Sequence, residues 1–135
     1  MGKEVKFLTA EEMVQRHKNQ EDPFSLVLDK WTRIQSCLNI AFTREDYLDI
    51  LEASQIPIPF CMELGARDAC HLCPLKHICQ PPDEGLESFW SGMYRLLQAY
   101  AWAGDFIDPE PLKRIVSELI SRVREARESL NTGPR

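Results

Sequence analysis

The residues best suited to chemistry are four cysteines gathered in one short segment. Cys61, Cys70, Cys73 and Cys79 follow the spacing Cys-x8-Cys-x2-Cys-x5-Cys. A Cys-x2-Cys pair lets two thiolates converge on one centre from a single turn, and two outer cysteines can complete a four-ligand shell. The sequence therefore predicts that these four residues bind a metal ion or a cluster.

The residue after the Cys-x2-Cys pair bears on which metal is bound. Zinc ribbons and knuckles usually place a glycine there, whereas Pro74 follows Cys73 and removes a backbone donor. The segment Cys70-His-Leu-Cys73-Pro-Leu-Lys-His-Ile-Cys79 resembles the [4Fe–4S] loop of endonuclease III-like and adenine-mismatch DNA glycosylases, which use Cys-x6-Cys-x2-Cys-x5-Cys. The last three cysteines match, and the first gap is longer here. The resemblance implies a [4Fe–4S] cluster held by Cys61, Cys70, Cys73 and Cys79.

The resemblance is confined to residues 61–79. No other part of the chain looks like the helix-hairpin-helix of those glycosylases, with its catalytic Asp and Lys. The net charge of −5 also argues against broad binding to a phosphate backbone. We therefore carry over the cluster ligands and not the activity on DNA, and we expect no nucleic-acid partner.

Structural zinc is the alternative to a cluster. His71 and His77 lie inside the cysteine segment, and either could replace a thiolate in a Cys3His site. Their plainer interpretation is that they donate hydrogen bonds to sulfur. Cys37 stands apart from the segment, and we interpret it as a small buried apolar residue, with a role as an exchangeable ligand as the alternative.

Length and composition favour one domain without disulfides. The chain has 135 residues and is 44% hydrophobic, which is enough to bury a core without covalent cross-links. We expect a single helical domain over residues 1–135, with residues 56–82 as an inserted cysteine-rich loop. The N-terminus lacks the apolar core of a signal peptide and no apolar run is long enough to span a membrane, so we expect a cytoplasmic protein with no membrane partner.

Helical signals position this loop. Apolar periodicity with N-cap residues predicts helices over about 10–18, 23–40, 83–103 and 109–130 and a further helix that begins at Thr43, and strand-like alternation is absent. Prolines at positions 57, 59, 81 and 82 stand on both sides of the cysteines. The sequence therefore predicts an all-α bundle of four or five helices, with a proline-bounded metal-binding loop between the third and fourth. Gly92, inside the fourth helix, would allow close approach of a neighbouring group.

No catalytic arrangement stands out. The chain has no glycine-rich phosphate loop, no Gly-x-Ser-x-Gly and no His-Glu-x-x-His. A pocket lined by Trp90, Tyr94 and Trp102 is the one enzymatic alternative. Because four protein thiolates close the metal shell, we expect electron transfer, redox sensing or a role as an accessory subunit, with a protein partner. The alternative is a zinc-stabilised protein–protein interaction module.

Overall fold

The computed structural model describes residues 7–41, 43–65, 72–80 and 85–132, and all regular structure within them is helical. In chain order the elements are α1 (Ala10–Lys18), α2 (Pro23–Ile40), α3 (Arg44–Ser54), a π-helical turn (Cys61–Gly65), α4 (Lys76–Cys79), α5 (Phe89–Ala103), a 3-10 turn (Gly104–Phe106) and α6 (Glu110–Thr132). The predicted all-α class is confirmed for these residues.

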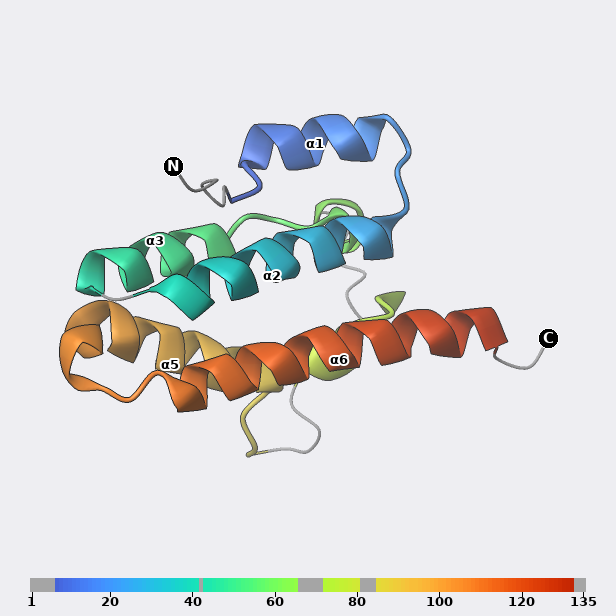
Figure 1. The fold of residues 1–135 in the computed structure, drawn as a ribbon. Coiled ribbons are helices and arrows are strands. Elements are labelled where there is room, and N and C mark those ends of the chain that lie inside the picture. Colours follow the sequence, from blue (N-terminus) through green and yellow to red (C-terminus); the bar gives the residue numbers. More distant parts are fainter. Residues whose placement is uncertain (1–6, 42, 66–71, 81–84, 133–135) are drawn as a thin grey trace.

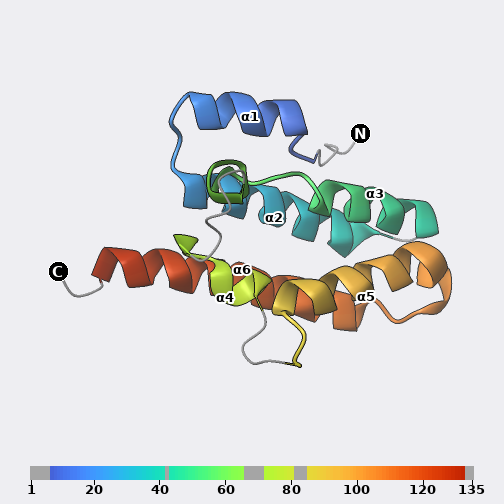
Figure 2. The ribbon, with the colours of Figure 1, turned by 180° about the vertical axis from the view of Figure 1, so that it is seen from behind.

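The helices form stacked layers, as Figure 1 shows. α2 and α3 lie side by side, α5 and α6 form the layer below them, and α1 lies above α2. The main layers meet through α3 against α5 and α2 against α6. Seen from behind, α4 lies next to α5 (Figure 2). No helix among the described residues is both long enough and apolar enough to cross a bilayer.

Local capping explains where the first three helices begin. The Thr9 hydroxyl accepts a hydrogen bond from Glu12 N at 3.0 Å, and the Glu12 carboxylate accepts one from Thr9 N. The Asp22 carboxylate caps α2, with Pro23 at its first position, where a missing N–H costs nothing. Thr43 and Asp46 form the same reciprocal cap on α3. These three starts are as predicted.

The start of α5 differs from the prediction, which placed it just after Asp83. Asp83 itself lies outside the described residues, but Gly85 has φ +86°, a left-handed conformation that an α-helix cannot contain. The helix begins at Phe89 instead, where the Ser88 hydroxyl accepts a hydrogen bond from Ser91 N at 3.0 Å. The segment leading into α5 is therefore longer than expected.

The main core lies between the two layers and contains the apolar faces of α2, α3, α5 and α6. Its fully buried side chains include Ile34, Leu38, Ile50, Met93, Leu97, Tyr100, Leu112 and Val116. On α3, Ile50 is buried in this core, whereas Leu48 is 46% exposed.

A second, smaller apolar cluster lies under α1. Leu8, Met13 and Leu26 are buried together there. The partly buried side chains packed against them, Ile56, Ile58 and Met62, belong to the segment that leads into and through the first candidate ligand. α1 therefore covers the approach to the cysteine segment.

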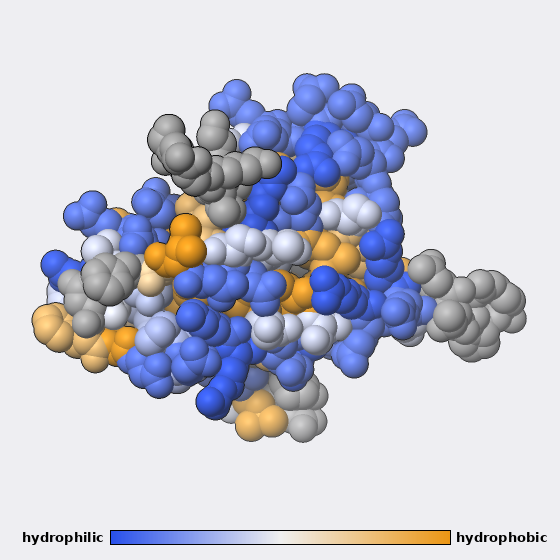
Figure 3. All heavy atoms as spheres, viewed as in Figure 1, coloured by the Kyte–Doolittle hydropathy of each residue, from blue (hydrophilic) through white to orange (hydrophobic). Residues whose placement is uncertain are grey.

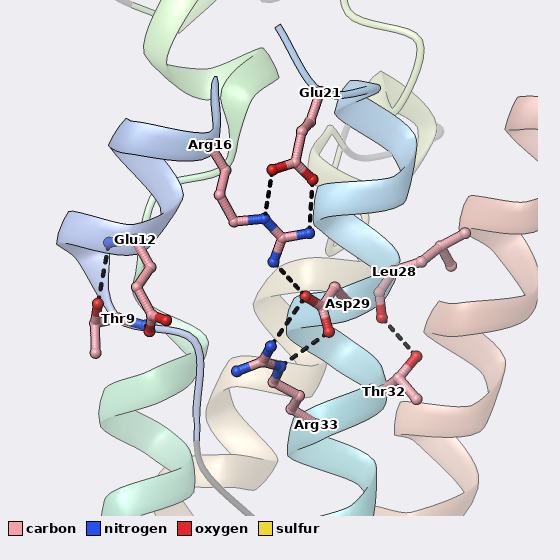
Figure 4. A network of polar contacts seen from close by, with 8 residues as sticks. All are labelled: Thr9, Glu12, Arg16, Glu21, Leu28, Asp29, Thr32 and Arg33. Atoms are coloured by element: carbon pink, nitrogen blue, oxygen red, sulfur yellow. Dashed lines mark hydrogen bonds and ion pairs between the residues drawn. The ribbon is translucent and has the colours of Figure 1, made fainter. Parts of the chain in front are cut away.

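An ion-pair network also ties α1 to α2. The Arg16 guanidinium donates two hydrogen bonds to the Glu21 carboxylate and a third to Asp29, and Asp29 also accepts from Arg33 (Figure 4). Burial alone would raise the pKa of Asp29, but the hydrogen bonds and charges of both arginines outweigh it and lower that pKa. The Asp29 carboxylate is therefore ionised at neutral pH and holds α1 in place.

Candidate metal centre

Two of the four predicted ligands lie at helical ends on either side of the cysteine segment. Cys61 is the first residue of the π-helical turn, and Cys79 is the last residue of α4. Pro59 and Phe60 are already helical, which agrees with the preference of proline for a first helical position. Sequence reasoning expected an irregular loop here, and the helical turns within it are a correction. π-helical turns are rare and frequently occur at functional sites.

Both cysteines line the same cavity. It has a volume of about 190 Å³, well above the space that one water molecule needs. Its walls come from α2, the segment after α3, the cysteine segment, α5 and α6. The lining residues are Val27, Lys30, Trp31, Ser54, Gln55, Ile56, Pro57, Ile58, Cys61, Leu75, Ile78, Cys79, Trp90, Leu119 and Val123. The fold thus brings the first and last predicted ligands to one hollow.

Cys73 is partly buried and packs against the main core. Its Sγ accepts a hydrogen bond from Leu75 N at 3.4 Å, and Leu75 also lines the cavity. A backbone N–H directed at sulfur is a common way to stabilise a thiolate ligand, and hydrogen bonds to sulfur are one of the factors that set cluster potentials. Pro74 has no backbone N–H to donate to the sulfur of Cys73, but the backbone N–H of Leu75, the next residue, does so.

The fourth predicted ligand, Cys70, and the alternate His71 lie outside the described residues. Within the residues that the structure describes, no three His, Cys, Asp or Glu side chains lie close enough together to hold a single metal ion. No disulfide joins two of the described cysteines. The structure therefore brings Cys61 and Cys79 to one cavity, and the complete four-cysteine shell stays a prediction.

Among the described residues of the cavity wall, the one charged side chain is a buried lysine that sequence reasoning missed. Lys30 is only 5% exposed, and its Nζ donates hydrogen bonds to Ser54 O at 2.8 Å and Ile56 O at 2.7 Å. Nζ also lies 5.1 Å from the centre of the Trp31 ring. Burial lowers the pKa of Lys30 to about 8, against the opposing effect of the charges of Cys61 and Cys79.

A sequence signal for Lys30 existed. Val27, Trp31 and Ile34 form the apolar stripe of α2, and position 30 belongs to the same stripe at helical spacing. A charged residue at such a position is almost never fully buried unless something compensates its charge. The pattern could therefore have marked Lys30 as a functional candidate, but not its partners.

The two described histidines, His17 and His77, differ in their positions relative to the cavity. His17 lies with Nε2 at 3.3 Å from Glu63 Oε1 in the π-helical turn. This contact links α1 to the turn that begins with Cys61. His77 is exposed on α4 and is absent from the cavity wall, so a role for it as an alternate ligand gains no support from its position.

Cys37 lies on α2 and packs against the main core, outside the wall of the cavity. Burial, followed by the charges of Asp46 and Asp49, raises the pKa of its thiol. A protonated, partly buried thiol matches the interpretation of Cys37 as a small apolar residue.

The predicted aromatic pocket is not formed as expected. Trp90 lines the cavity and meets Trp31 edge to face, with ring centroids 5.9 Å apart, and Tyr94 stacks on Trp90. Trp102, however, is 79% exposed and lies near the end of α5. Apolar atoms gather at this end of the molecule in Figure 3, where Phe106 is also exposed. Trp102 therefore contributes to the surface and not to a pocket with Trp90.

The described wall of the cavity offers two sulfur donors and one ammonium group. Thiols at Cys61 and Cys79, with Cys73 nearby in sequence, supply soft ligands, and Lys30 supplies a positive charge next to them.

Comparison of this chain with protein-family models, with curated proteins and with solved structures finds no match.

Proposed function

We propose that this protein binds one [4Fe–4S] cluster through Cys61, Cys70, Cys73 and Cys79 and uses it in electron transfer or redox sensing with a protein partner. The observation that carries the proposal is the shared cavity, in which Cys61 and Cys79 face the same space as a buried ammonium group. When bound, such a cluster accepts and releases single electrons.

The surroundings of the cavity support a redox role more than a catalytic one. Apart from the two thiols and the Lys30 ammonium, the wall is mostly apolar, which limits the access of water. No Asp, Glu or His lines it, so a general acid–base pair is absent from the described wall.

Exposure of the ligands supports exchange with a partner. Cys61 and Cys79 are both exposed residues, so their side of the cavity reaches the protein surface. Electrons pass most readily between proteins when the redox centre lies close to the surface of each. A partner would therefore dock over the π-helical turn and α4.

The proposal is tested by anaerobic reconstitution with iron and sulfide. The wild-type protein should turn brown, and dithionite should bleach its visible absorbance. Cys61→Ser and Cys79→Ser should each lose most of the bound iron, because each removes a ligand. Cys37→Ser is the matched control and should retain the wild-type iron content.

Two outcomes would contradict the proposal. A colourless protein that binds one zinc ion and shows no response to dithionite would replace the cluster with structural zinc. Equal iron content in Cys37→Ser and Cys79→Ser would show that the cavity is not the site.

A further inference from the structure

We infer that Lys30 is the internal counter-charge of the metal centre and raises the reduction potential of the cluster that the cysteines hold. This inference rests on the proposed function. It assigns to one residue of α2 a role in setting the redox behaviour of a site whose ligands all come from another segment.

The first step is that Lys30 is a buried cation without a full negative charge beside it. Among the described residues, its hydrogen-bond partners are two backbone carbonyls, and no carboxylate lies within ion-pair distance of Nζ. Backbone carbonyls carry only partial charges, even at the C-terminus of α3, where Ser54 lies. Burying a charge without an opposite charge is energetically costly, so a nearby anion would stabilise the Lys30 ammonium group.

The second step is that the anion available to Lys30 is the cysteine site. Lys30, Cys61 and Cys79 line one cavity, so thiolates at these two cysteines would face the buried ammonium group. A metal centre with four thiolate ligands carries a net negative charge, whether it holds zinc or a cluster in its oxidised state. The buried ammonium group and the thiolate shell therefore compensate one another.

The third step concerns the effect on redox behaviour. Reduction adds one electron from an external donor such as dithionite or an electrode, and thus one negative charge, to the cluster. A fixed cation in a cavity with mostly apolar walls stabilises the more negative state more strongly, because charges interact more strongly there than in water. Lys30 should therefore favour the reduced form, and its removal should lower the midpoint potential.

The position of Lys30 is also fixed, which a tuning residue requires. Its two hydrogen bonds reach the end of α3 and the chain just before Pro57, so the ammonium group joins α2 to the approach to Cys61. A side chain held at three points, including the ring of Trp31, cannot turn away to solvent. Its charge therefore acts at a constant place on the cavity wall.

The experiment compares Lys30→Gln, Lys30→Arg and Lys113→Gln with the wild-type protein, all reconstituted anaerobically. The reduction midpoint is measured by a redox titration followed by electron paramagnetic resonance. Lys113→Gln is the matched control, because it removes the same charge from α6 outside the cavity wall. Circular dichroism of each apoprotein reports whether the variant folds.

We expect Lys30→Gln to shift the ratio of oxidised to reduced cluster at least about tenfold towards the oxidised form, which equals ~59 mV for one electron. Lys30→Arg and Lys113→Gln should stay near the wild-type midpoint. A midpoint in Lys30→Gln equal to that of the wild type would overturn the inference while leaving the proposed function intact.

Loss of the cluster in Lys30→Gln is also decisive. If Lys30→Arg then holds a cluster at the wild-type midpoint, the positive charge is needed to hold the cluster, which supports the role of Lys30 as its counter-charge. If Lys30→Arg also fails to hold a cluster, the role of Lys30 is structural, and the inference fails. The same conclusion follows if neither Lys30→Gln nor Lys30→Arg folds. A wild-type protein that takes up no cluster would remove the proposed function, and the inference with it.

Discussion

The small apolar cluster under α1 gives a test of how the fold holds the cysteine segment. Met13 is fully buried in it, beside Leu8 and Leu26, and this cluster is separate from the main core. Met13→Ala removes three heavy atoms. At roughly 0.8 kcal/mol for each buried group, the transfer loss is about 2.4 kcal/mol, and the cavity left behind brings the cost to about 2–5 kcal/mol.

The loss should be local more than global. Because Met13 contacts the smaller cluster, its truncation weakens the packing of Ile56, Ile58 and Met62 and leaves the interface of α2 with α6 intact. Hydrogen exchange followed by mass spectrometry should show faster exchange in α1 and in residues 56–62, with unchanged protection in α6. Iron uptake should fall as well, since Cys61 lies inside the loosened segment.

The matched control is Val14→Ala, on the same helix. Val14 is 40% exposed, so its truncation should change the free energy of unfolding by less than about 0.5 kcal/mol. Equal effects of the two substitutions, or uniform loss of protection across all helices in Met13→Ala, would refute the idea that α1 acts as a separate cover for the cysteine segment.

Three further predictions concern the segment, the core and the ion pairs. Cys73→Ser should speed hydrogen exchange in the described residues between 57 and 80 while α6 keeps its protection, because the core contacts of α6 lie elsewhere; uniform collapse would contradict this. Gly104→Ala should destabilise the protein by about 1–3 kcal/mol in urea titrations, since the added Cβ would collide with the Tyr47 ring. Gly92→Ala, where the nearest atom lies 3.6 Å from the added Cβ, should stabilise the protein by up to about 1 kcal/mol; the reverse order would be inconsistent with the packing. Asp29→Asn should cost about 1–2 kcal/mol at pH 7. Because the folded-state pKa of Asp29 is below its ordinary value of 3.8, that contribution is present above pH 3.8 and lost as the pH falls through the folded-state pKa, so urea titrations of variant and wild type should converge in acid; a difference that does not depend on pH would count against the ion pairs.

Features that depend on neighbouring residues were predictable from the sequence. The starts of α1, α2 and α3 follow from cap residues within three positions of the helix, and these starts, with the ends of α1 and α2, match the expectation. The start of α5 was not predictable in this way, because Asp83 and Ser88 are both good caps. The choice between them depends on the positive φ of Gly85, which the residue type permits but does not impose.

Contacts between distant segments could not be predicted. Lys30 meets Ser54 and Ile56 through a tertiary contact, and the pairing of His17 with Glu63 depends on how α1 lies over the π-helical turn. At Gly92, where a close approach was expected, an added Cβ would meet only the Glu87 side chain at 3.6 Å, and the tight contact occurs instead at Gly104 against Tyr47. Spacing along the chain predicted the ligand types, and only the fold shows what surrounds them.

Elemental analysis combined with visible spectroscopy of anaerobically purified, reconstituted protein tests the central claim most directly. A [4Fe–4S] site predicts iron and inorganic sulfide in equal amounts, four of each per chain, with a brown colour that dithionite removes. Protein that stays colourless after reconstitution, or that contains one zinc ion per chain and no sulfide, would contradict it.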